Sequence, residues 1–113
     1  MEKQNHTLVT LAESLEIDTD MLKEILILFF EHMPGQIDSM RTAVSQKDYT
    51  NLHIISHTLK GTAANLLYTN ISKTAAEVEK LAVAKHEDEQ DYEAYFNKLS
   101  LLLSHAKMKI FYQ

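Results

Sequence analysis

Four residues of this chain have types and a spacing that could support chemistry on a histidine: His57, Lys60, Gly61 and Glu79. His57 lies in an amphipathic stretch, and at about 100° per residue it falls roughly 140° from Leu52 on the apolar stripe, so it should face solvent. Lys60 and Gly61 follow one turn later and place a cation and a missing side chain beside the imidazole. Glycine inside a helix costs about 1 kcal/mol relative to alanine, which suggests that something approaches the helix here.

A carboxylate from a second segment should lie level with His57. His57 and Glu79 are each eleven residues from Tyr68, and Tyr68-Thr69-Asn70 looks like a tight turn between two antiparallel helices. A carboxylate that accepts a hydrogen bond from Nδ1–H fixes the tautomer and leaves Nε2 as the nucleophile. The alternative interpretation of Glu79 is an ordinary surface carboxylate.

The elements that would position these residues are all helical. Only two glycines and one proline occur in the chain, too few for many turns between short strands. Apolar residues at three- and four-residue steps predict helices over about 8–15, 21–44, 49–67, 71–82 and 91–110. The second should pass Pro34 as one kinked helix or two nearly collinear ones, with Ile25 on its apolar stripe. We therefore expect an all-α fold, an antiparallel up-and-down four-helix bundle with a short extra N-terminal helix across one end.

Composition favours one domain over residues 1–113 and a cytoplasmic location. The 113 residues are enough for a single core, and the net charge of -5 disfavours nucleic acid and anionic lipid as partners. The absence of cysteine fits a reducing compartment and removes disulfides and thiolate chemistry. The start of the sequence lacks a signal-peptide core, and the longest apolar run is too short to span a bilayer. We expect a monomer without direct membrane contact.

The run His57-Thr58-Leu59-Lys60-Gly61-Thr62-Ala63-Ala64-Asn65-Leu66 resembles the H-x-L-K-G-x-A-x-x-L motif of histidine-containing phosphotransfer (HPt) domains, which serve two-component phosphorelays. The resemblance covers roughly residues 21–81, whereas the last helix matches in character only. Two positions depart from the family pattern. Ser56 stands where alanine is common, and Leu67 stands where glycine or another small residue is usual.

The resemblance implies a role for each residue of the candidate site. His57 would be phosphorylated, Lys60 would steady the phosphoryl oxygens, Gly61 would leave space for the partner, and Glu79 would hold the imidazole. The module would accept the phosphoryl group from a receiver-domain aspartate and pass it to another receiver domain, in a response regulator or a hybrid sensor kinase.

No GxxxxGK[ST] loop is present, so we expect a phosphorelay intermediate rather than an ATP-using kinase, with no cofactor of its own. Any Mg²⁺ would belong to the partner's receiver domain. On the helical wheel, His53, Ile54 and Ala64 lie around His57 and are candidates for partner binding.

Two alternatives remain open on the sequence. His53 and His57, four residues apart, could share a zinc ion, although no HExxH glutamate lies between them and Lys60 would place a cation against the metal. The other alternative is a helical partner-binding module without phosphoryl chemistry. The remaining histidines, His6, His32, His86 and His105, are scattered and should be surface or packing residues.

Overall fold

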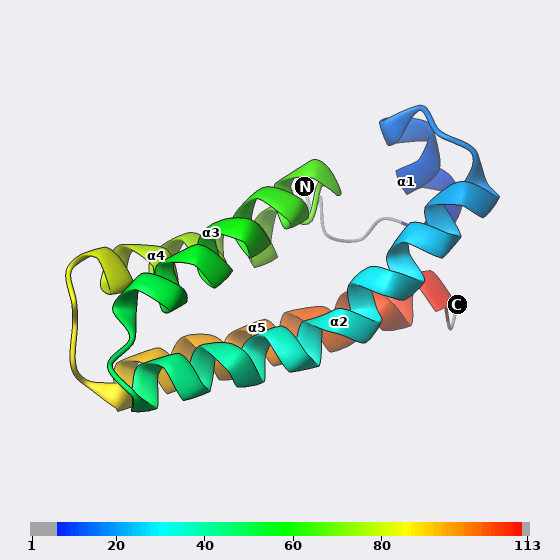
Figure 1. The fold of residues 1–113 in the computed structure, drawn as a ribbon. Coiled ribbons are helices and arrows are strands. Elements are labelled where there is room, and N and C mark those ends of the chain that lie inside the picture. The colour runs from blue at the N-terminus through cyan, green and yellow to red at the C-terminus, as the bar shows by residue number, and fades with distance from the viewer. Residues whose placement is uncertain (1–6, 112–113) are drawn as a thin grey trace.

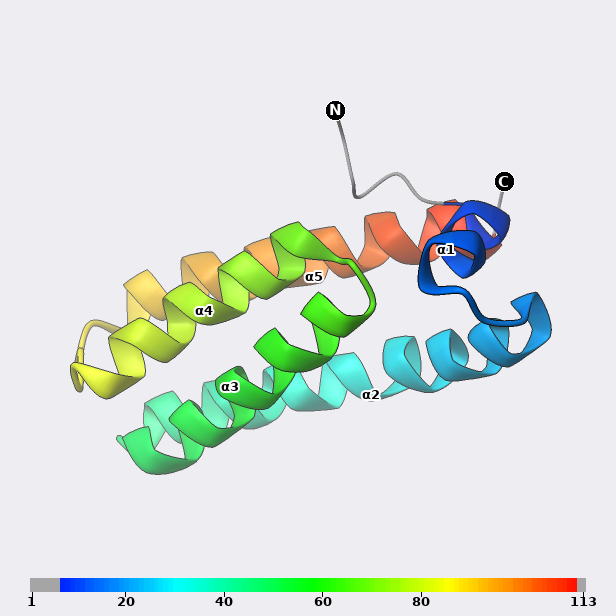
Figure 2. The same cartoon turned by 90° about the horizontal axis from the view of Figure 1, so that it is seen from above.

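The computed structural model describes residues 7–111, and this range forms five helices. They are α1 (Leu8–Leu15), α2 (Thr19–Ser45), α3 (Tyr49–Asn65), α4 (Thr69–Val83) and α5 (Glu89–Phe111). Helices α2 to α5 form an antiparallel up-and-down bundle (Figure 1). Helix α1 packs across the end where α2 begins and α5 finishes (Figure 2). The predicted all-α fold class is confirmed.

One apolar core runs along the bundle and receives side chains from all five helices. Each fully buried large aliphatic or aromatic side chain contributes about 1.5–3 kcal/mol by leaving water. Helices α3 and α4 flank only part of the longer α2 and α5, and α1 covers the end that they leave (Figures 1 and 2). None of the helices within residues 7–111 has both the length and the apolar character needed to cross a membrane.

Helix α2 continues through Pro34 as a single helix of 27 residues. The predicted apolar stripe is wrong at Ile25, which is 40% exposed, whereas Leu26 and Phe30 are buried. The reason lies in the packing of α2, which begins beside α1, contacts α5 and α3, and leaves Ile25 at the edge of the groove toward α3. The buried face therefore turns along the helix, and one stripe cannot describe its whole length.

Short connections close the helices without glycine. After α1, α2, α3 and α4, one residue takes a left-handed conformation with φ between 55° and 65°: Glu16, Lys47, Leu67 and Lys85. At each end the following amide donates to a carbonyl five residues earlier, as in a Schellman motif. Both glycines of the chain lie inside helices instead. Non-glycine residues therefore adopt the strained left-handed conformation at these helix ends, and the backbone hydrogen bonds offset the strain.

The predicted turn at Tyr68-Thr69-Asn70 is shifted by two residues. Helix α3 ends at Asn65 instead of Leu67, and α4 already begins at Thr69. The chain reverses at Leu67, with φ 65°, and the ring of Tyr68 is buried against Phe29. The left-handed conformation of Leu67 also explains in physical terms why a small residue would suit this position.

Candidate functional site

Helix α3 presents His57 to solvent, as the helical wheel predicts. The helix begins with an N-cap at Asp48, whose side chain accepts a hydrogen bond from the amide of Asn51 at 3.1 Å. Two turns later the side chain of His57 is 63% exposed. Ser56 next to it is fully buried, and its hydroxyl donates to the carbonyl of Leu52 at 2.8 Å. A serine is thus accommodated in the core at this position because its own helix satisfies the hydroxyl.

Glu79 on α4 lies opposite His57 on α3. Its Oε2 is 2.8 Å from Nδ1 of His57, and its side chain is only 14% exposed. The two helices are also joined by the hydroxyl of Ser72, which donates to the carbonyl of Lys60 at 2.9 Å. The prediction that the carboxylate of Glu79 lies beside the imidazole of His57 is confirmed. The atom that faces the carboxylate is Nδ1, so Nε2 is left for an external reactant.

Glu79 also contacts two further side chains of α3. Its Oε2 accepts from Nε2 of His53 at 3.0 Å, and its Oε1 accepts from Nζ of Lys60 at 2.7 Å. The hydrogen bond from Lys60, followed by those from the imidazoles of His57 and His53, lowers the pKa of Glu79 to about 2, although partial burial acts in the opposite direction. One ionised carboxylate thus holds three polar side chains of α3.

Sequence reasoning treated His53 only as a docking residue or as a zinc ligand with His57. It missed the hydrogen bond between His53 and Glu79. The signal was available, because a residue four positions before His57 lies on the same side of the helix and reaches the same carboxylate. Lys60 was expected to face phosphoryl oxygens, and it is paired with Glu79 in the structure.

The ion pairs of Glu79 should make stability fall in acid. Its pKa is lowered from 4.5 to about 2 by folding, so the stabilisation is complete above about pH 4.5 and disappears as the pH falls through about 2. The shift corresponds to about 3 kcal/mol, which water around the half-exposed partners reduces to about 1–2 kcal/mol. Urea unfolding of wild type and Glu79→Gln across this range should show their difference shrinking toward acid. A difference independent of pH would contradict the ion pairs.

The two sides of His57 differ in character. At about 100° per residue, His53 and Lys60 lie on its α4 side, and Ile54 and Gly61 lie on the side toward α2. Ile54 is 57% exposed, and Ala64 is exposed one turn beyond Gly61. A Cβ built on Gly61 would meet no atom within 4 Å. Nothing in the packing of residues 7–111 therefore requires a glycine at this position.

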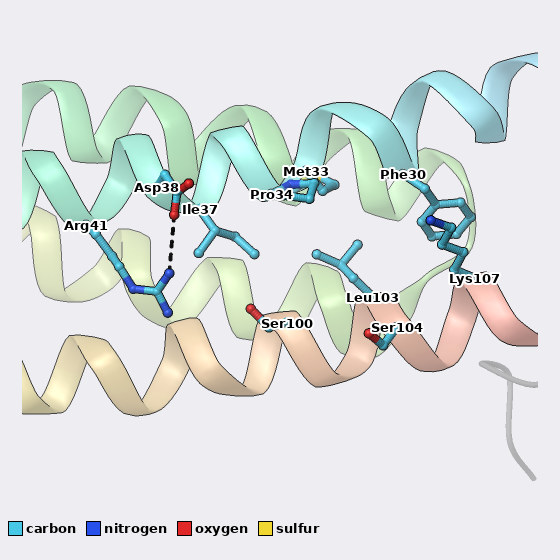
Figure 3. A pocket seen from close by; sticks show the side chains of 10 residues that line it. All are labelled: Phe30, Met33, Pro34, Ile37, Asp38, Arg41, Ser100, Leu103, Ser104 and Lys107. Carbon is cyan, nitrogen blue, oxygen red and sulfur yellow. Dashed lines mark hydrogen bonds and ion pairs between the residues drawn. The ribbon is translucent and has the colours of Figure 1, made fainter.

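Two grooves lie along α2 on different sides of the bundle. A cavity of about 540 Å³ separates α2 from α3 and borders Thr58 and Thr62, beside the histidine. A smaller cavity of about 260 Å³ lies between α2 and α5, with Met33, Ile37 and Leu103 along it (Figure 3). Since His57 and Glu79 lie on the α3–α4 seam, the α2–α5 groove is on the opposite side of the bundle. Of these two grooves, the one between α2 and α3 adjoins the candidate site.

The other histidines lie elsewhere. His86 contacts Asp91 at 2.7 Å next to α5, His32 lines the α2–α3 groove, and His105 is exposed on α5. His6 lies outside the described residues. The cluster at Glu79 thus contains the two histidines that stand four residues apart.

A comparison with protein families finds a match for this chain. The model of the Hpt domain family matches residues 24–108. The match extends beyond the roughly 60 residues of the sequence resemblance and includes most of α5. No curated protein and no solved structure matches the chain. Hpt domains are histidine phosphotransfer modules of phosphorelays and interact with receiver domains, and this chain belongs to the Hpt domain family.

Proposed function

We propose that the chain accepts a phosphoryl group on Nε2 of His57 from the aspartyl phosphate of one receiver domain and passes it to the aspartate of another. The observation that carries the proposal is the 2.8 Å contact between Nδ1 of His57 and Oε2 of Glu79. With the ring proton on Nδ1, the lone pair of the neutral imidazole is on Nε2. The side chain that bears this nitrogen is 63% exposed, as a reaction with a second protein requires.

The reaction would proceed by attack of Nε2 on the phosphorus of the aspartyl phosphate. The new N–P bond forms as the P–O bond to the aspartate breaks, and the aspartate leaves as a carboxylate. Positive charge develops on the ring, and Glu79 stabilises it through the Nδ1–H hydrogen bond. Passing the group to a second aspartate reverses these steps. Mg²⁺, where needed, would be bound by the receiver domain.

Lys60 would help by moving from Glu79 to the phosphoryl oxygens. Its ammonium is already at the site, 2.7 Å from Oε1 of Glu79, and its side chain is 36% exposed. The three equatorial oxygens carry negative charge in the transition state, so a nearby cation lowers the barrier. Lysine suits this exchange because its ammonium is a compact charge on a flexible stem.

The receiver would dock over the small and apolar side of His57. Gly61 and Ile54 are exposed there, Ala64 is exposed almost in line with His57, and the α2–α3 groove continues the surface. His53 would lie at the edge of this interface next to Glu79. We propose that the chain acts as a single monomeric domain in the cytoplasm, for which one core shared by all five helices and the absence of cysteine are the support.

Gly61→Ala should stabilise the fold and slow the transfer. Alanine in place of a helical glycine contributes about 0.5–1 kcal/mol, and its Cβ meets no atom within 4 Å in this chain. The same methyl group would stand where the receiver approaches His57, so the transfer rate should fall several-fold. Urea unfolding and transfer kinetics measure the two effects.

Gly35→Ala is the matched control, because a Cβ on Gly35 also meets nothing within 4 Å inside α2. It should give a similar gain in stability and an unchanged transfer rate. Equal transfer rates for Gly61→Ala and the wild type would count against close approach of the receiver at Gly61.

The direct test is transfer of label from a phosphorylated receiver domain. The chain is incubated with several receivers that carry a labelled aspartyl phosphate, and the product is checked for acid lability and stability in base. Peptide mapping should then place the label on the peptide that contains His57. Label on another residue, or no label from any receiver, would overturn the proposal, and the second outcome would favour a binding module without phosphoryl chemistry.

A further inference from the structure

We propose that His53, His57 and Glu79 form a binding site for Zn²⁺, and that zinc at this site prevents phosphoryl acceptance by His57. The metal-binding half of the proposal stands on the geometry of the cluster alone. The second half rests on the proposed function of His57. The ligand atoms would be Nε2 of His53, Nδ1 of His57 and Oε2 of Glu79.

These three atoms are already gathered. Oε2 lies 3.0 Å from Nε2 of His53 and 2.8 Å from Nδ1 of His57, and all three atoms lie within 4.8 Å of one another. Zinc bonds to nitrogen and oxygen are about 2.0–2.2 Å long, so tetrahedral ligands stand roughly 3.4 Å apart. Side-chain rotations can make this adjustment, because the backbones of α3 and α4 already set the spacing.

The chemistry of the donors favours zinc over magnesium. Two imidazoles and one carboxylate suit Zn²⁺, whereas Mg²⁺ prefers oxygen ligands and keeps its waters. The side chains of His53 and His57 are 44% and 63% exposed, so an ion can enter from solvent and keep a water in its fourth position. Within residues 7–111 this is the one cluster of three histidine or acidic side chains that could hold a metal.

Lys60 has two opposing effects on this site. Its bond of 2.7 Å to Oε1 turns the carboxylate so that Oε2 faces both imidazoles, as an outer-shell partner does. Its positive charge also repels the metal and limits the affinity. In phosphoryl transfer the same charge would be favourable. Removing the charge should therefore strengthen zinc binding and weaken transfer.

Zinc would block acceptance through the tautomer of His57. In the structure Nδ1 faces the carboxylate, so Nδ1 carries the proton and Nε2 the lone pair. A metal on Nδ1 needs the lone pair of that atom, and the single proton of the neutral ring then lies on Nε2. An Nε2–H nitrogen has no lone pair for attack on phosphorus. Metal binding and phosphoryl acceptance thus require opposite tautomers of the same ring.

Calorimetric titration of the full chain with Zn²⁺, without any receiver, tests the binding. Wild type should bind one ion and Mg²⁺ should not compete. His53→Gln should weaken the binding at least tenfold, Lys60→Gln should tighten it several-fold, and His105→Gln, a control on α5, should leave it unchanged. Absence of saturable binding, or equal affinity in His53→Gln, would overturn the site.

NMR of the imidazole nitrogens tests the tautomer. The proton of His57 should be on Nδ1 in the free chain and on Nε2 after zinc addition, and a chelator should reverse the change. An unchanged tautomer would overturn the blocking mechanism. Zinc should also suppress labelling from a phosphorylated receiver whose own dephosphorylation is followed in parallel. Labelling in the absence of zinc tests the proposed function by itself. A failure of phosphoryl acceptance can therefore be distinguished from a failure of zinc to block it.

Discussion

Replacing His57 with glutamine should abolish the acceptance of a phosphoryl group from receiver domains. Glutamine has a similar volume, but its amide has no nucleophilic nitrogen, so the N–P bond cannot form. The side chain is 63% exposed, so the variant should fold as wild type does. Transfer from a labelled receiver should therefore fall to background while the helical circular dichroism spectrum and the unfolding midpoint change little.

His105→Gln is the matched control for this experiment. It makes the same chemical change at an exposed position on α5, and its labelling rate should equal that of wild type. Label retained by His57→Gln would mean that another residue accepts the group. His53 would then be the first residue to examine, because its imidazole lies beside the same carboxylate.

The position of the site could be predicted because it depends on local helical geometry. The wheel of α3 places His57 opposite Leu52, and the structure has the first exposed and the second buried. The alignment with Glu79 followed from counting outward from a turn. The turn was misplaced by two residues, yet the predicted contact was found. A shift of two residues is less than one helical turn of 3.6 residues, so the two side chains remain within reach of each other.

Features that depend on tertiary packing could not be predicted in the same way. Ile25 and Leu26 are adjacent apolar residues, and the choice between them depends on which helices surround the start of α2. The burial of Tyr68 depends on the left-handed conformation of Leu67, which no local preference of leucine favours. The sequence pattern placed Tyr68 in a tight turn, whereas its side chain packs in the core.

The hydrogen bonds among the polar side chains of the site also could not be predicted from the sequence. A helical wheel shows that His53 and Lys60 lie on the side of α3 that faces Glu79. It does not show which of their atoms contacts which carboxylate oxygen. The structure has His53 and His57 on Oε2 and Lys60 on Oε1. This division matters, because it leaves one carboxylate oxygen facing two imidazoles.

Removing the side chain of Glu79 should have the second largest effect on phosphoryl transfer. In Glu79→Ala, His57 loses the acceptor of its Nδ1 proton at 2.8 Å. The ring can then rotate and populate both tautomers, and the charge that develops on it during attack loses its counter-ion. For a histidine that binds a metal, losing the carboxylate that orients the ring typically costs about 10- to 100-fold in affinity or activity, and we expect a loss of similar size here. Single-turnover transfer from a phosphorylated receiver should slow by this factor.

Glu79→Gln separates the hydrogen bond from the charge. The amide oxygen can still accept from Nδ1–H, so the orientation of the ring should be kept, whereas the ion pair with Lys60 is lost. If orientation dominates, Glu79→Gln should transfer within a few-fold of wild type and far faster than Glu79→Ala. If both variants are equally slow, the negative charge itself is what the reaction needs. If both match wild type, Glu79 serves the fold rather than the chemistry, since its contacts with α3 would then affect unfolding alone.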